Sequence, residues 1–130
     1  MLAETTFLID LLKAKKEAID FLEKNTIPLL YTTEICVFEL MVGAYALRDK
    51  PEQEVQKINA LLSRIVVLQV DRRAIIKAGE IAGTLLKQGK QIEDTDCLIA
   101  GIALSNGINQ MITRNKEHYQ RIPGITILEY

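Results

Sequence analysis

The stretch Cys97-Leu98-Ile99-Ala100-Gly101-Ile102-Ala103-Leu104, with Gln110-Met111-Ile112-Thr113 six residues further on, decides the fold. Both pieces belong to one run without a charged residue. The run is interrupted by the polar residues Ser105, Asn106, Asn109 and Gln110. It therefore predicts a buried helix, a turn and a buried strand, because a membrane span needs about 18 consecutive apolar residues. A helix followed by a strand that is apolar on both faces is typical of a parallel sheet covered on both sides.

The rest of the chain shows the same alternation of short strands and longer helices. Strands are predicted at Met1–Glu4, Ile27–Tyr31, Ile65–Leu68, Gln110–Thr113 and Thr126–Tyr130. Helices are predicted from Thr5 or Thr6 through Leu12, from Lys15 to Asn25, from Thr32 or Thr33 to Arg48, and over Pro51–Ser63, Arg72–Gln88, 94–106 and Lys116–Arg121. We therefore expect an α/β protein with a three-layer α/β/α architecture and a central, mostly parallel five-stranded sheet.

Length and composition set limits on function. The 130 residues are 48 % hydrophobic and 25 % charged, which predicts one globular domain over 1–130 and excludes disorder. The net charge of −1 means that nucleic-acid binding would need a local basic surface or a metal. Glu4 and Asp10 interrupt the apolar opening, which argues against a signal peptide. Cys36 and Cys97 lie in apolar segments without metal-ligand spacing, so we expect buried free thiols in a cytoplasmic protein with no membrane association.

Five carboxylates stand in or beside apolar segments: Glu4, Asp10, Glu39, Asp94 and Asp96. Carboxylates are rarely buried unless they are paired or bind a cation. Several acids brought together from distant parts of the chain indicate an oxygen-rich pocket for a hard divalent metal. In a parallel sheet such a pocket lies at the carboxyl ends of the strands, where Glu4 and Asn115 are expected.

Each acid also has an ordinary structural interpretation. Glu39 is the only charged residue between Ile35 and Leu47, so this segment has no polar, solvent-exposed helix face on which Glu39 would be an ordinary surface residue. Asp96 could serve only to stabilise a helix N-terminus, and Asp94 could be the N-cap. Asp10 could be an exposed helix residue, and Glu4 could pair with a lysine. Together with Glu39, these acids form a pattern that favours function.

The basic and nucleophilic residues are less specific. His118 is the only histidine and has no partner serine or cysteine motif, so we expect a surface histidine rather than a catalytic triad. Gly79 and Gly83 lie inside a helix and do not form a phosphate loop. Arg114 and Lys116 follow the fourth predicted strand and could contact a phosphate backbone near the acids.

Four blocks of this sequence, in order, resemble the PIN domain family. Glu4-Thr-Thr-Phe-Leu-Ile-Asp10 is similar to the family's opening block, and Glu39-Leu-Met-Val-Gly43 to its second acidic block. Asp94-Thr-Asp-Cys-Leu-Ile-Ala100 is similar to the third, and Thr113-Arg-Asn115 with Arg121-Ile-Pro-Gly124 to the closing block. The chain is most similar, also in length, to the small toxins of VapBC-type toxin–antitoxin pairs.

The resemblance implies a PIN-like fold and a Mg²⁺- or Mn²⁺-dependent endoribonuclease that cleaves RNA phosphodiester bonds. It implies Glu4, Asp96 and Asp94 as metal ligands, with Glu39 holding a water or a second ion. It also implies that Thr6, Arg114, Asn115 and Lys116 position ligand or substrate. A cognate antitoxin protein and a homodimer are further implied. The chain departs from the pattern at Glu4, where the family usually has aspartate, and at Asn115, a fourth acidic position in many members.

Three other classes of protein share some of these features. A response-regulator receiver domain needs adjacent acids after its first strand and a lysine after its last, and neither is present. A phosphatase of the Asp-x-Asp class is excluded because Thr5-Thr6 follow Glu4. The departures at Glu4 and Asn115 keep open a catalytically degenerate PIN domain that only binds RNA or protein.

Overall fold

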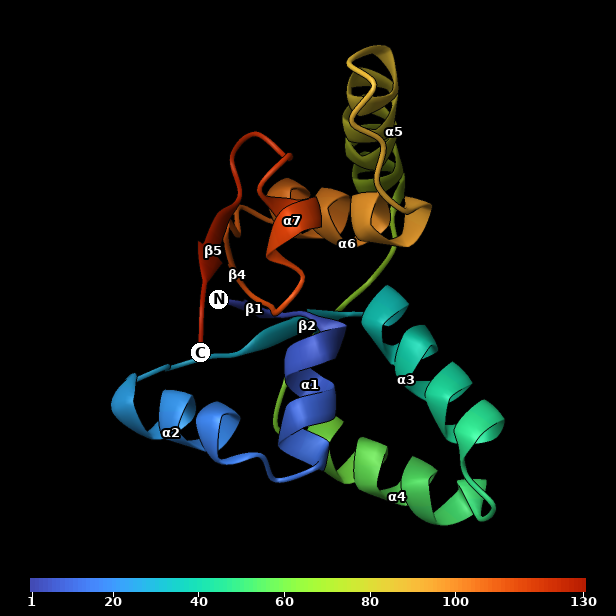
Figure 1. The fold of residues 1–130 in the computed structure, drawn as a ribbon, viewed down its shortest axis with the longest axis vertical. Coiled ribbons are helices and arrows are strands. Elements are labelled where there is room, and N and C mark those ends of the chain that lie inside the picture. The colour runs from blue at the N-terminus through green and yellow to red at the C-terminus, as the bar shows by residue number, and fades with distance from the viewer.

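The computed structural model describes residues 1–130 and shows the predicted α/β/α architecture (Figure 1). Its strands are β1 (Leu2–Ala3), β2 (Tyr31–Thr33), β3 (Val66–Leu68), β4 (Gln110–Ile112) and β5 (Thr126–Leu128). Its helices are α1 (Thr5–Leu12), α2 (Lys16–Lys24), α3 (Glu34–Leu47), α4 (Pro51–Leu62), α5 (Arg72–Lys87), α6 (Asp94–Ser105) and α7 (Lys116–Tyr119). No helix is long and apolar enough to cross a membrane.

The five strands form one sheet in the order β3-β2-β1-β4-β5, and every neighbouring pair is parallel. Helices α1 to α4 lie on one side of the strands, and α5, α6 and α7 lie on the other (Figure 1). The core is continuous through both sides and includes Leu2 and Phe7 with Ile99, Ile112 and Tyr119, all completely buried. The three layers and the five-stranded sheet expected from the sequence are confirmed, and the sheet is wholly parallel.

Several element boundaries differ from the prediction, and two of the differences have a clear physical cause. The second strand spans Tyr31–Thr33, so it begins at the last residue of the predicted strand Ile27–Tyr31. Strand β2 is hydrogen-bonded on both edges, and Pro28 has no N–H to donate. The N-cap of α1 is Glu4 rather than Thr5 or Thr6, since its carboxylate accepts a hydrogen bond from the Thr6 backbone N–H.

Helix α6 packs closely against α5 at Gly101. A Cβ at this position would lie 2.7 Å from the Ala78 backbone nitrogen and 2.8 Å from the Ala74 carbonyl oxygen. Backbone atoms cannot move aside cheaply, so the two helices owe their close approach to the missing side chain. This contact fixes α6, which carries Asp96, against its neighbour.

Substituting Gly101 by alanine is expected to reduce the free energy of unfolding by about 1–3 kcal/mol, because the added methyl overpacks the helix contact. Gly79→Ala on α5 is the matched control, since nothing lies within 4 Å of its added Cβ. The control should gain up to about 1 kcal/mol of helix propensity. Urea denaturation of both variants measures the difference, and equal stability of the two would contradict this account of the contact.

Candidate active site

The strand order places a topological switch point between β1 and β4. From the central strand β1 the chain first builds β2 and β3 on one side, and later builds β4 and β5 on the other. Parallel α/β sheets bind ligands where the strand order reverses, at the carboxyl ends of the strands. Glu4 follows β1 and Thr113 follows β4, so both lie at this point.

Glu4 is almost completely buried, and only one of its two carboxylate oxygens is used by the protein. Oε2 accepts hydrogen bonds from the Thr6 N–H at 3.0 Å, the Thr6 hydroxyl at 2.6 Å and the Thr113 hydroxyl at 2.7 Å. The positive end of the α1 dipole faces the same carboxylate, which is the N-cap of the helix. Oε1 accepts no hydrogen bond from the protein and is free for another ligand.

Glu39 lies half-buried on α3, and its Oε1 accepts a hydrogen bond of 2.7 Å from the Thr5 hydroxyl. Burial raises the pKa of Glu39, and the negative charges of Glu4, Asp96 and Glu93 raise it further, while the Thr5 bond opposes them. The repulsion shows that acids from α1, α3 and α6 converge on one region. The other oxygen, Oε2, accepts no hydrogen bond.

Asp96 is buried in the first turn of α6 and contacts three side chains of α7 and its N-cap. Tyr119 donates its hydroxyl to Oδ1 at 3.0 Å, and His118 Nδ1 lies 2.6 Å from Oδ2. Asn115 Nδ2 approaches Oδ2 to 3.4 Å. Asn115 Nδ2 also lies 3.0 Å from Nδ1 of His118, so the amide, the imidazole and the carboxylate form one cluster. Burial and the charges of Glu4 and Asp96 raise the pKa of Tyr119 well above its ordinary value, so it remains a donor.

Two of these contacts were not anticipated from the sequence. His118 lies on a short helix and its side chain is 31 % exposed, but the prediction of a surface histidine missed that its imidazole faces the buried Asp96 carboxylate. Tyr119 was not singled out at all. The available signal was the spacing of Asn115, His118 and Tyr119, which puts all three on one face of a single helical turn.

The structure brings Glu4, Glu39, Asp96, Thr6 and Asn115 together, whereas the other candidates lie apart from this pocket. Asp94 occupies the first position of α6, so it is not the N-cap, and its exposed side chain makes no hydrogen bond or ion pair. Glu93, not Asp94, acts on Glu39. Asp10 is buried away from the acids and pairs with Arg114 at 2.9 Å. Lys116 pairs with Glu129.

The donor set suits a hard divalent cation that keeps much of its water. No group of three or more histidine, cysteine, aspartate or glutamate side chains is arranged to hold an ion by itself. Mg²⁺ needs only one or two carboxylates and retains several waters. Glu4 Oε1 and Glu39 Oε2 are oxygens without a protein donor. Asp96 is linked to Glu4 by hydrogen bonds through Asn115 and Thr113. The pocket is therefore an open carboxylate site, which fits such an ion.

Comparisons with known proteins agree with this geometry. The family model described as PIN domain matches residues 1–124. The tRNA(fMet)-specific endonuclease VapC of Salmonella typhimurium is 33 % identical over 78 % of this chain and 79 % of its own length. Ribonuclease VapC1 of Haemophilus influenzae is 32 % identical over 94 % of this chain and 91 % of its own.

A solved structure supports the same relationship. The crystal structure of DNA-bound VapBC from Salmonella typhimurium superposes with a TM-score of 0.87 at 29 % identity, covering 98 % of this chain and 96 % of that one. Similarity of sequence and of fold thus extends over nearly the whole chain. The chain belongs to the PIN domain family, among its VapC ribonucleases.

Proposed function

We propose that this protein is the toxin of a VapBC-type toxin–antitoxin pair, an endoribonuclease that depends on Mg²⁺ or Mn²⁺. The observation that carries the proposal is the chain of hydrogen bonds that links Glu4 to Asp96 through Thr113 and Asn115 at the switch point of the sheet, with Glu39 bonded to Thr5 next to Glu4. The names of the VapC relatives support the reaction class. We place the reaction in the cytoplasm, where RNA is abundant and the free buried thiols Cys36 and Cys97 stay reduced.

Each acid has a separate task in this proposal. Glu4 and Asp96 would hold the ion, directly or through water, and Glu39 Oε2 would accept a proton from the attacking water. When bound, the ion supplies charge neutralisation at the scissile phosphate and lowers the pKa of a coordinated water. The raised pKa of Glu39 makes it a better base than an ordinary carboxylate. Thr5, through its hydrogen bond to Oε1, keeps Oε2 free for the proton.

Other side chains would orient the ligands and the RNA. Thr6 bridges Glu4 Oε2 and the Arg114 backbone N–H, so it ties the first acid to the segment after β4. Arg114 and Lys116 would contact RNA phosphates, because acids alone repel the backbone. Asn115 lies within reach of Asp96 and would supply an uncharged contact at the pocket.

We expect His118→Ala to weaken Mn²⁺ binding by about 10- to 100-fold, since residues that orient a ligand carboxylate typically have effects of this size. His118→Asn is the informative partner, because its amide nitrogen can take the place of Nδ1 and should restore most of the affinity. Calorimetry with Mn²⁺ measures both constants without any RNA. Equal affinities for wild type and His118→Ala would contradict the role of His118 as a positioning residue.

An apolar groove beside the pocket fits an antitoxin segment. It has a volume of about 130 Å³ and runs between α1, α3 and α4, with Leu12, Leu40 and Ile58 among its walls and Glu39 at its margin. A helix or strand lying there could extend a basic side chain toward the acids. Exposed apolar residues also occur on α5, at Ile75, Ile76 and Leu86, which leaves a second face for the proposed homodimer.

Expression in a bacterial host tests the toxin function. Wild-type protein is expected to arrest growth, and Asp96→Asn should relieve the arrest at equal protein level. Initiator tRNA is the first RNA to follow, because a relative carries that specificity in its name. Unimpaired growth with the soluble wild-type protein present would contradict the proposal.

A further inference from the structure

Asp10 is a buried acid that the proposed chemistry does not use. Its side chain is 2 % exposed, yet it meets three partners: Lys15 Nζ lies 2.9 Å from Oδ1, and Arg114 Nε lies 2.9 Å from Oδ2. The Tyr130 hydroxyl donates to Oδ2 at 2.9 Å. Burial opposes ionisation, but Lys15, Tyr130 and the charge of Arg114 outweigh it and hold the pKa of Asp10 below its ordinary value. Asp10 is therefore a fixed negative charge shared by two cations.

The local structure is built to bring these partners together. Helix α1 ends at Leu12, and Ala14 in the turn after it adopts a left-handed φ of 50°. This turn lets the Lys15 N–H donate to the Asp10 carbonyl at 2.9 Å. The Tyr130 ring packs edge-on against Phe7 with 4.7 Å between centroids, so its hydroxyl is held over Asp10. Burial and Asp10 raise the pKa of Tyr130 to about 12, which keeps it a donor.

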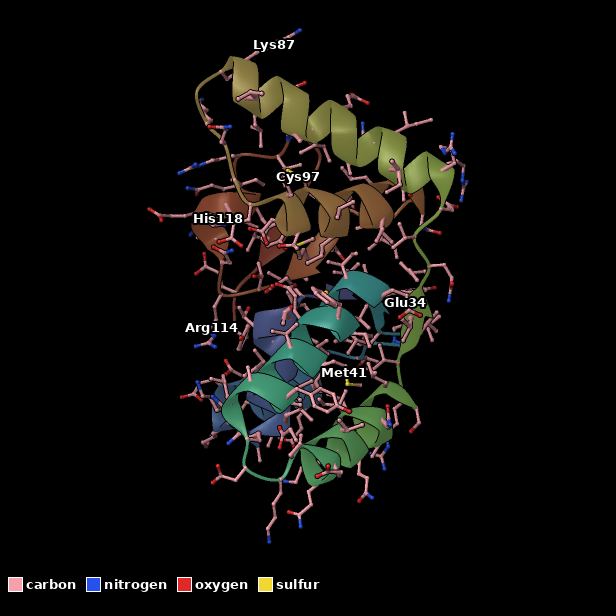
Figure 2. All side chains as sticks on the ribbon, turned by 90° about the vertical axis from the view of Figure 1, so that its right-hand side faces the viewer. Glu34, Met41, Lys87, Cys97, Arg114 and His118 are labelled. Atoms are coloured by element: carbon pink, nitrogen blue, oxygen red, sulfur yellow. The ribbon has the colours of Figure 1, made fainter.

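Arg114 connects this cluster to the active site. Its backbone N–H donates to Thr6 Oγ1 at 3.0 Å, and Thr6 in turn donates to Glu4. Its side chain is 50 % exposed although its Nε faces the buried Asp10. A shallow groove of about 230 Å³ lies beside it, lined by Thr113, Arg114, Lys116, Glu129 and Tyr130. Arg114 and His118 lie along the same edge of the molecule (Figure 2).

We infer that Asp10 is a positioning residue that holds the Arg114 guanidinium through Nε and presents it to a backbone phosphate of RNA in this groove. The inference rests on the proposed function and adds a subsite to it. A free arginine side chain loses rotamer freedom when it binds, so an arginine that is already fixed binds a phosphate more tightly. The single negative charge of Asp10 lies between the two positive charges of Arg114 and Lys15, so the cluster keeps a net positive charge that attracts a phosphate.

The inference makes a prediction whose sign differs from that of simple electrostatics. Removing a negative charge beside a phosphate site should strengthen RNA binding if only net charge matters. If Asp10 positions Arg114, Asp10→Asn should weaken binding despite the gain in positive charge. Glu129→Gln is the matched control, because it removes a negative charge from the same groove and leaves Lys116 without its ion-pair partner. This variant should bind RNA as tightly as its parent or more tightly.

The experiment is fluorescence anisotropy of labelled initiator tRNA in EDTA, with every variant made in a Glu39→Gln parent that does not cleave. Asp10→Asn and Arg114→Ala are each expected to weaken binding by about 10-fold, and the double variant should be no weaker than Arg114→Ala alone. Arg114→Lys, at an exposed position, should also bind weakly, because lysine cannot use one nitrogen for Asp10 and others for a phosphate.

Three results would overturn the inference, and the third would also overturn the proposed function. Tighter or unchanged binding by folded Asp10→Asn would show that net charge, not position, controls this surface. Should Asp10→Asn fail to fold, unchanged binding by Arg114→Lys would be equally decisive against it. A parent that binds no RNA at all would overturn the proposed function and this inference with it, so the two failures are distinguishable. With the active enzyme, Asp10→Asn should raise KM more than it lowers kcat.

Discussion

Replacing Glu39 by glutamine is expected to lower kcat for RNA cleavage by about 10²- to 10⁴-fold, the range found when a general base is removed. Glutamine keeps the size of the side chain and can still accept the Thr5 hydrogen bond, but it cannot take a proton from water. The raised pKa of Glu39 is the reason for assigning this task to it rather than to Glu4 or Asp96. Single-turnover cleavage of initiator tRNA at saturating metal measures the effect.

Glu34→Gln provides the control for that result. Glu34 lies in the first turn of the same helix, and its carboxylate contacts Gln69 at 3.3 Å rather than any acid of the pocket. The control should cleave at close to the wild-type rate. Wild-type activity in Glu39→Gln, or an equal loss in both variants, would contradict the role proposed for Glu39.

The second large effect is on stability, because the acids repel one another until a cation is bound. A divalent ion that binds only the folded protein stabilises it by about 2.7 kcal/mol at 100 times its Kd. For a chain of this size that corresponds to a rise in Tm of several degrees. Thermal unfolding with and without Mn²⁺ measures it, and Glu39→Gln should show a smaller rise.

The pH dependence without metal has a defined sign. The pKa of folded Glu39 is raised, so its proton is bound more tightly in the folded state than in the unfolded state. Its contribution to stability is present below the unfolded pKa of about 4.3 and is lost as pH rises through the folded pKa. Glu39→Gln should therefore be more stable than wild type at pH 7, and the difference should shrink toward pH 4. A variant less stable than wild type at pH 7 would contradict the repulsion.

Patterns that depend on neighbours in the sequence were predictable, and contacts between distant segments were less so. The uncharged run after Asp96 predicted helix α6 and strand β4, and the strand ends then indicated where Glu4 and Asn115 would meet. Capping was harder, because Glu4, Thr5 and Thr6 can each accept a backbone N–H, and only the tertiary bond from Thr113 distinguishes them.

The errors share one physical cause. Asp10 and His118 are polar residues on amphipathic segments, and their sequence neighbours do not show whether a partner covers them. Asp10 is buried because it contacts Arg114 and Tyr130, which are more than 100 positions away in the sequence. His118 faces Asp96 because α7 packs on α6. Arg114 and Lys116 were correctly placed after the fourth strand, but their ion pairs with Asp10 and Glu129 could not be read from spacing.

Cleavage of a mixture of structured RNAs by the purified protein, with Mg²⁺, with Mn²⁺ and with EDTA, tests the central claim most directly. The account predicts cutting with either metal, no cutting in EDTA, and none with Asp96→Asn under any condition. Cutting that persists in EDTA or in Asp96→Asn would contradict a carboxylate-held metal as the basis of activity. If the same protein cut no RNA and calorimetry showed that it binds no Mn²⁺, it would instead be a PIN domain that only binds its partners.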